Sequence, residues 1–390
     1  MTIKGTACIV GAYEHPTRKA PHLTLAQIHA ESTLGALRDA GLGKADIDGY
    51  FCDSEAPGLG ANSMADYMGL KLRHVDTTET GGSSYLAHVS HAAQAIAAGK
   101  CNVALITLAG RPRFEGSSVS SQSPFLSPTI PDVDFEVPYG AALVNLYALC
   151  AARHMHEYGT TSEQLAWIKV AASHHAQHNP HAMLKTVVTV EDVVNSPMIA
   201  DPLHRLDCCV VSDGGGALIV ARPEIARSLK SPLVSVMGAG EAIKTQNGGR
   251  IDVTYTAAAA SGRAAFAEAG VTPSDIDYAS IYDSFTITVL MQLEDLGFCE
   301  KGKGGRFVAD GNLISGVGKL PFNTDGGGLC NNHPGNRGGI TKVIEAVRQL
   351  RGEAHPAVQV KDCRLALAQG IGGPLSTRHA SATLVLERQS

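Results

Sequence analysis

The sequence predicts a layered α/β protein made of two copies of one unit. Three observations support this prediction. Helix-spaced and strand-like segments alternate along the chain, a stretch of ten residues recurs, and glycine is abundant at 42 of 390 residues while aromatic residues make up 5%. Alternating helices and strands favour a sheet covered by helices. The hydrophobic fraction of 44% is enough for a packed core, which excludes a disordered chain.

The elements of the first unit follow from the spacing of apolar residues. A helix is expected from Leu23 to Ala40 and ends at Gly41, and another runs from the glycines at 81–82 to Gly99. Glycine closes both helices because it adopts the left-handed conformation without steric cost. The expected strands are apolar runs, and they lie at residues 7–11, within 46–51, at 103–107 and, after a turn, within 212–220.

This alternation breaks between residues 111 and 200. Residues 117–127 are rich in serine and proline and are expected to form a loop. Two helices are expected around residues 139–158 and 162–178. We interpret the stretch as an insertion in the first copy, at a place where it could cover a substrate.

The two copies are recognised by an internal repeat. Residues 39–48 match residues 268–277, and the offset is 229 residues. A second echo follows in the same order, because the glycines at 81–82 and those at 326–328 each precede a helix and a strand. The repeat indicates a duplicated domain. The predicted halves are residues 1–225, which include the insertion, and residues 231–390.

Charge and cysteine content exclude several classes of protein. Lysine and arginine total 32 against 37 aspartates and glutamates, and this net charge of -5 argues against a partner made of nucleic acid or anionic lipid. No apolar run is long enough to span a membrane, and residues 1–5 lack the apolar core of a signal peptide. The nine cysteines form no Cys-x-x-Cys pair, so reduced thiols in a cytoplasmic protein are expected.

The duplication places the chemistry at the pseudo-twofold axis, where equivalent loops of the two halves meet. The first candidate segment begins with Gly81 and Gly82, which let the backbone approach a ligand and expose amides that favour negative charge. Ser83 and Ser84 follow at the start of a helix. They are either a nucleophile or oxyanion contacts, or they cap the helix.

Two further segments offer groups that transfer protons. Tyr282 follows the repeated Asp-Ile-Asp at the end of a strand, where α/β sites gather, and it is either a proton donor or a packed tyrosine beside a helix-capping Asp283. His333 lies among six glycines at 326–339 and is a candidate general acid or base. The alternative for His333 is a purely structural histidine.

The fourth segment is glycine-rich and follows a buried strand at residues 365–368. Gly372 lies in it, and its amide could contribute to an oxyanion hole, although a plain tight turn explains the same glycines. Elsewhere, four histidines at residues 174, 175, 178 and 181 have neither the spacing nor the carboxylate partner of a metal site. No metal is therefore expected.

These segments together resemble the thiolase superfamily, over essentially the whole chain. Asn331–Gly335 is similar to the family's Gly-His-Pro segment, Tyr282–Phe285 resembles the His-Asp-Cys-Phe segment of the sterol-carrier-protein branch, and Asp213–Ala217 looks like that branch's Asp-Gly-Ala-Ala segment. The resemblance implies the thiolase fold. This fold has two βαβαβαββ halves in five α-β-α-β-α layers, with a loop domain inserted in the first half.

The sequence departs from the family at its cysteines. No cysteine lies between Cys52 and Cys101, where thiolases carry the nucleophile. Gly372 ends the segment that holds a second cysteine in many thiolases, and Ser284 stands where the sterol-carrier branch has its cysteine. Tyr282 replaces that branch's histidine, whereas His333 is retained.

One chemistry that needs no covalent nucleophile is the retro-aldol cleavage of a β-hydroxyacyl-CoA to a ketone or aldehyde and a shortened acyl-CoA. The chain resembles thiolase-like steroid side-chain aldolases that also lack the cysteine. This resemblance implies Tyr282 as acid or base and His333 as a second proton-transfer group or oxyanion donor. Gly372 and residues 81–84 would add oxyanion or CoA contacts, and Asp283 and Asn332 are expected to help bind the substrate.

Two other functions remain open. The first is a β-ketoacyl-CoA thiolase or acyltransferase with an altered nucleophile, for which Ser83 and Cys330 are the candidates. The second is a non-catalytic subunit that binds acyl-CoA. The resemblance implies a homodimer, and its aldolase branch implies a small partner with an OB-fold and a zinc ribbon. A CoA thioester is the expected substrate, no bound cofactor is expected, and the acyl group stays open.

Overall fold

The computed structural model describes residues 2–118, 137–139, 142–245, 251–335, 338–375 and 378–389. Most of the loop predicted at residues 117–127 lies outside these residues, as do Asn336 and Arg337 of the predicted histidine segment. The described part of the chain is a mixed α/β structure, as the sequence predicts.

A mixed sheet of nine strands organises the described residues, in the order β3-β2-β4-β7-β1-β8-β11-β10-β9. The strands are β1 (Cys8–Glu14), β2 (Gly49–Phe51), β3 (His74–Asp76), β4 (Val103–Gly110), β7 (Gly214–Ala221), β8 (Val234–Lys244), β9 (Tyr278–Ile281), β10 (Leu365–Gly372) and β11 (His379–Arg388). Only Cys8 and Ile9 of β1 pair with β8, so two half-sheets meet along a short seam.

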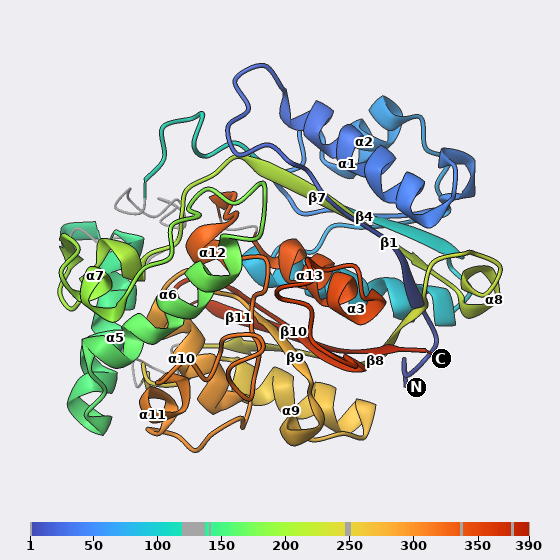
Figure 1. Ribbon diagram of the computed structural model, residues 1–390. Helices are drawn as coiled ribbons and strands as arrows, with labels where there is room; N and C mark the ends of the chain where they lie inside the picture. The colour runs from blue at the N-terminus through green and yellow to red at the C-terminus, as the bar shows by residue number, and fades with distance from the viewer. Residues whose placement is uncertain are drawn as a thin grey trace.

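Helices form three layers around the half-sheets (Figure 1). The α3 and α13 helices lie between them, α1 and α2 cover the first half-sheet, and α9 covers the second. The longer helices are α1 (Leu25–Ala40), α2 (Ala61–Met68), α3 (Ser84–Ala97), α5 (Leu143–Tyr158), α6 (Ser162–Ala176), α9 (Ala258–Ala269), α10 (Thr286–Asp295) and α13 (Gly339–Arg351). The short ones are α7 (Val190–Val194), α8 (Pro223–Ala226), α11 (Gly304–Val308) and α12 (Gly327–Cys330).

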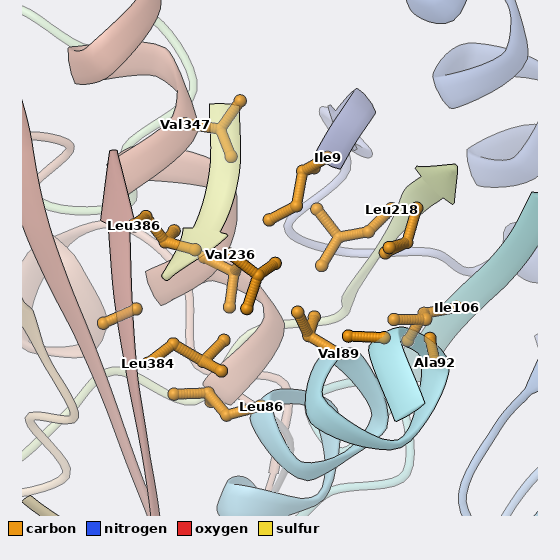
Figure 2. Close-up of a cluster of buried hydrophobic side chains, with 14 of the residues drawn as sticks. Ile9, Leu86, Val89, Ala92, Ile106, Leu218, Val236, Val347, Leu384 and Leu386 are labelled. Carbon is orange, nitrogen blue, oxygen red and sulfur yellow. The ribbon is translucent and has the colours of Figure 1, made fainter. Parts of the chain in front are cut away.

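The central core fills the space between the half-sheets. Figure 2 shows apolar side chains from α3 and α13 packed against strands of both halves, and these side chains are fully buried. Labelled members are Ile9, Leu86, Val89, Ala92, Ile106, Leu218, Val236, Val347, Leu384 and Leu386. Burial of one large aliphatic side chain contributes about 1.5–3 kcal/mol. The core therefore fixes the two halves to each other and sets the position of the loops at their ends.

The duplication predicted from the repeat is confirmed by the topology. The order β2-β4-β7-β1 in the first half matches β9-β10-β11-β8 in the second. Corresponding residues of the repeat also form equivalent hydrogen bonds. Asp48 accepts hydrogen bonds from two backbone amides at the start of β4 (2.7 and 2.9 Å), and Asp277 accepts two at the start of β10 (both 2.9 Å).

The glycines at 326–328 are not the structural counterparts of Gly81 and Gly82, contrary to the prediction from the sequence. The α13 helix, which is the counterpart of α3, begins at Gly339 directly after Gly338. The glycines at 326–328 open the short α12 helix instead. Both runs of glycines precede a helix, and only the fold shows which of the two helices lies between the half-sheets.

The stretch between β4 and β7 contains α5, α6, α7 and a hairpin of β5 (Met198–Ala200) and β6 (Leu203–His204). Thr161 forms a capping box at the start of α6, and Gly159 ends α5 in the left-handed conformation, which explains the two helices predicted here. Their apolar faces form a second core with α10. The domain boundaries at residues 225 and 231 stay a prediction.

The histidines near the end of α6 make packing and hydrogen-bond contacts. His175 is buried, and its Nε2 accepts a hydrogen bond from the Ser315 amide at 2.9 Å, while His178 stacks on His355. Within the described ranges, no group of three or more His, Cys, Asp or Glu side chains is arranged to hold a metal ion. None of the described helices is both long and apolar enough to cross a membrane.

Candidate active site

A cavity of about 460 Å³ opens where the end of β10, the turn before α3 and the loop before α13 meet. Its volume lies in the range of pockets for small molecules. Five residues singled out in the sequence line it, namely Gly82, Tyr282, Ser284, His333 and Gly372. Loops from both halves therefore converge here.

Tyr282 and His333 form the polar centre of the cavity lining. Their rings meet edge to face with centroids 5.4 Å apart, and the residues are only 4% and 9% exposed. Glycines make room for this pair. A Cβ atom at Gly82 would lie 2.3 Å from the Tyr282 ring, and one at Gly338 would lie 3.3 Å from the His333 ring. Larger residues at Gly82 would displace the tyrosine.

Both rings are uncharged at neutral pH. Burial raises the pKa of Tyr282 well above its usual value of 10, so the hydroxyl keeps its proton. Burial lowers the pKa of His333 to about 4, although the nearby Asp283 carboxylate partly opposes this shift. The Nε2 atom of His333 is buried and has no hydrogen-bond partner among the described residues. The pair thus combines a proton donor with a neutral imidazole nitrogen.

A chain of hydrogen bonds holds the His333 loop in place. The backbone N–H of His333 donates to the Ser212 hydroxyl at 2.8 Å, which in turn donates to the side-chain carbonyl of Asn332 at 2.7 Å. The amide of Asn332 then donates to the Glu14 carboxylate at 3.0 Å. Asn332 was expected to contact substrate, but the structure places its side chain in this chain of bonds and outside the cavity lining.

Asp283 has a similar positioning role. Its fully buried carboxylate accepts hydrogen bonds from the amides of Gly328 and Leu329 at 2.8 and 3.1 Å. It also pairs with the buried ammonium of Lys342 at 2.7 Å. The carboxylate therefore joins the Tyr282 segment to α12 and α13. It does not line the cavity where substrate contact was expected.

The other candidates lie behind the lining. Ser83 donates to the Thr80 carbonyl at 2.7 Å, and the Ser84 hydroxyl accepts from the Thr80 amide at 2.8 Å. Gly81 has a φ of +64° and packs against Gly372, where a Cβ atom would meet the neighbouring backbone at 2.8 Å. Cys330 is buried in the second core, and burial raises the pKa of its thiol. None of these side chains lines the cavity.

Several lining residues were missed in the sequence. Tyr147 of α5 packs its ring at a tilt against Phe285 with centroids 4.3 Å apart, and its hydroxyl donates to the Gly373 carbonyl at 3.2 Å. Cys209 also lines the cavity. The helical pattern around Tyr147 gave no functional signal. Cys209, however, lies in an apolar stretch before the Ser212 turn, and strand-like alternation there could have shown which cysteine of the 208–209 pair faces a site.

Comparison with known proteins places the chain among enzymes of acyl-CoA chemistry. Residues 240–388 match the family model described as "Thiolase C-terminal domain-like". The chain is 36% identical to the acetyl-CoA acetyltransferase of Methanothermobacter thermautotrophicus, over 88% of this chain and 90% of that protein. It is 34% identical to the steroid side-chain-cleaving aldolase of Thermomonospora curvata, over 90% of this chain and 91% of that protein.

A solved structure is similar over nearly the whole chain. The structure titled "Ltp2-ChsH2(DUF35) aldolase" is 33% identical and superposes with a TM-score of 0.88, covering 99% of this chain and 98% of that chain. The likeness therefore extends to both halves of the chain.

Proposed function

The chain belongs to the thiolase superfamily, and we propose that within it the protein cleaves a β-hydroxyacyl-CoA by a retro-aldol reaction. The observation that carries this proposal is the neutral Tyr282–His333 pair in a cavity without a reactive thiolate. Cys209 is the one cysteine among the described lining residues, and burial raises its pKa strongly, so it is a thiol at neutral pH. An acyl-enzyme would need the thiolate.

The proposed reaction uses groups that the cavity provides. Nε2 of His333 accepts the proton of the β-hydroxyl, and the bond between the α and β carbons breaks to release a ketone or aldehyde. The other fragment is the enolate of a CoA thioester. The Tyr282 hydroxyl donates a hydrogen bond to its oxygen, and the backbone around Gly82 and Gly372 offers further donors. This chemistry requires no bound cofactor.

The lining suggests a bulky, apolar acyl group. Tyr147, Phe285 and Leu143 contribute apolar surface to the cavity lining. Two of the similar proteins are named for substrates that contain rings, the steroid side-chain-cleaving aldolase and benzoylsuccinyl-CoA thiolase subunit BbsB of Thauera aromatica. We therefore include polycyclic and aromatic thioesters in the proposed substrate class.

We also propose that the chain acts as a homodimer with a small partner that carries an OB-fold and a zinc ribbon. The similar aldolase structure is named for two components, Ltp2 and ChsH2, which supports a second subunit. Strand β3 is at one edge of the sheet, and Val75 in its middle is 44% exposed, which supports pairing with a second copy.

The products of the reaction test the proposed function. The chain, with and without its co-expressed partner, is incubated with β-hydroxyacyl-CoA and β-ketoacyl-CoA thioesters in the presence or absence of free CoA. We expect an aldehyde or ketone plus a shortened acyl-CoA, formed without free CoA and identified by mass spectrometry. Two acyl-CoA products that form only when CoA is added would instead establish a thiolase. Binding of thioesters without turnover in either case would identify a non-catalytic subunit.

The pKa of His333 predicts how cleavage depends on pH. The imidazole accepts a proton only in its neutral form, and the lowered pKa of about 4 keeps it neutral at higher pH. We therefore expect kcat/KM to be flat from about pH 5 to 8 and to fall about tenfold per pH unit below 4. Samples returned to pH 7 control for acid unfolding. An acidic limb near the ordinary histidine pKa of 6.5 would contradict this assignment.

A further inference from the structure

We propose that the thiol of Cys209 donates the proton that converts the enolate into the acyl-CoA product. This inference rests on the proposed retro-aldol reaction and completes it. Cleavage leaves a carbanion equivalent at the α-carbon, so the reaction needs an acid at that carbon as well as a base at the hydroxyl. His333 acts at the β-hydroxyl oxygen and Tyr282 at the thioester oxygen. Neither residue is assigned to protonate the α-carbon.

The side chain of Cys209 faces the cavity because of the alternation in its segment. Residues 208, 210 and 212 are buried, whereas Cys209 and Val211 between them are partly exposed and both line the cavity. Side chains of an extended segment point alternately to opposite sides. The neighbouring Cys208 therefore points away, and its thiol donates to the His204 carbonyl at 3.4 Å.

The segment is fixed at both ends to the two groups of the polar pair. The Cys209 amide donates to the carbonyl of Ser284, two residues after Tyr282, at 2.9 Å. At the other end, Ser212 holds the backbone of His333. Cys209 and Tyr282 both line the cavity, and a negative charge on the sulfur would raise the pKa of the tyrosine hydroxyl. His333, whose buried Nε2 has no hydrogen-bond partner among the described residues, lines the same cavity.

Two other hydroxyls of the cavity lining, those of Tyr147 and Ser284, already have hydrogen-bond partners. The Tyr147 hydroxyl donates to the Gly373 carbonyl, and Ser284 lies within hydrogen-bond distance of the Thr288 hydroxyl at 3.2 Å. Burial raises the pKa of Cys209, so its proton is present at neutral pH. The thiol is still a far stronger acid than the α-carbon of a thioester, and transfer to the enolate is favourable.

The cycle balances in protons and electrons. His333 takes the hydroxyl proton, and the electron pair of the broken carbon–carbon bond stays on the α-carbon as the enolate. The S–H bond of Cys209 breaks as a C–H bond forms at that carbon. The imidazolium of His333 then returns its proton to the Cys209 thiolate, directly or through water. No oxidant, reductant or further reactant is required.

Deuterium exchange tests the step apart from carbon–carbon cleavage. A group that protonates the enolate also removes an α-proton from the product thioester in the reverse direction. The full chain in D₂O, with its partner present, is incubated with acetyl-CoA or propionyl-CoA, and uptake of deuterium is followed by mass spectrometry. We expect exchange by the wild-type protein and a loss of about 100-fold or more in Cys209→Ala and Cys209→Ser. His333→Ala should slow exchange as well, because in the reverse direction the imidazole takes the proton of the Cys209 thiol before the thiolate removes the α-proton.

Matched variants decide the outcome. Cys208→Ser changes the adjacent buried thiol and should exchange at the wild-type rate, which separates the chemistry from local folding. Wild-type exchange by both Cys209 variants, or no exchange by a wild-type protein that cleaves its substrate, would overturn the inference while leaving the retro-aldol reaction intact. Failure of the proposed function is seen separately, as the absence of cleavage by the wild-type protein.

Discussion

Substitution of His333 by alanine is expected to lower kcat for retro-aldol cleavage by about 10²–10⁴-fold, and Tyr282→Phe by about 10²–10³-fold. His333→Ala removes the only neutral imidazole that lines the described part of the cavity. Tyr282→Phe removes one hydroxyl and leaves the ring, which preserves its edge-to-face contact with His333. Steady-state kinetics with the substrate identified by product analysis measure both effects.

The two variants should differ in more than size. If Tyr282 stabilises the enolate oxygen, its loss lowers kcat with little change in KM, because the hydrogen bond strengthens only as charge develops. Loss of His333 should also abolish the acidic limb near pH 4. Residual activity of the double variant should be well above the product of the two single losses, because groups that act in one step are not additive.

His175→Gln is the matched control for these variants. His175 is also a buried histidine, and burial lowers its pKa to about 4, but it lies in α6 and does not line the cavity. We expect this variant to lose stability and to keep kcat in the fraction that remains folded. Cleavage at the wild-type rate by Tyr282→Phe would remove the tyrosine from the proposed chemistry.

The fold was largely predictable because its determinants are local and repeated. Gly41 and Gly159 end helices at the positions predicted, and the repeated aspartates Asp48 and Asp277 hold equivalent strands. The resemblance to the family then predicts that Tyr282 and His333 lie at one site. These observations depend on short stretches of sequence whose physical roles are fixed by backbone hydrogen bonds.

The remainder of the site depends on contacts between distant segments. Asp283 and Asn332 are polar residues next to the two reactive groups, and nothing in their own segments shows whether they face the substrate. Lys342, in the first turn of α13, pairs with the Asp283 carboxylate, and Glu14 accepts the hydrogen bond of the Asn332 side chain, so distant residues determine where both side chains point. Cys209 enters the cavity only because its segment runs beside residues 284–285. Such pairings require the tertiary structure.

The buried pair of Asp283 and Lys342 leads to the largest expected effect on stability. Asp283→Ala should lower the free energy of unfolding by about 3–5 kcal/mol, because it leaves an ammonium group that is 2% exposed without its carboxylate. It also leaves the amides of Gly328 and Leu329 without their acceptor. Urea denaturation followed by circular dichroism measures the change.

The partner variant separates charge from hydrogen bonding. Asp283→Asn should be nearly as destabilised as Asp283→Ala, because the neutral amide does not compensate the charge of Lys342. Adding Lys342→Met to Asp283→Asn removes the buried charge altogether and should restore most of the loss, leaving the cost of weaker bonds to α12. A double variant no more stable than Asp283→Asn alone would show that the pair does not govern this region.

Activity distinguishes this positioning role from the substrate contact first expected of Asp283. The carboxylate ties the Tyr282 segment to α12, which leads into the His333 loop, so its loss should lower kcat by loosening the geometry of both groups. In that case the double variant with Lys342→Met should regain activity together with stability. A stable Asp283→Asn protein with unchanged kcat and a raised KM would instead show that the carboxylate binds the thioester substrate, and the role assigned from the structure would fall.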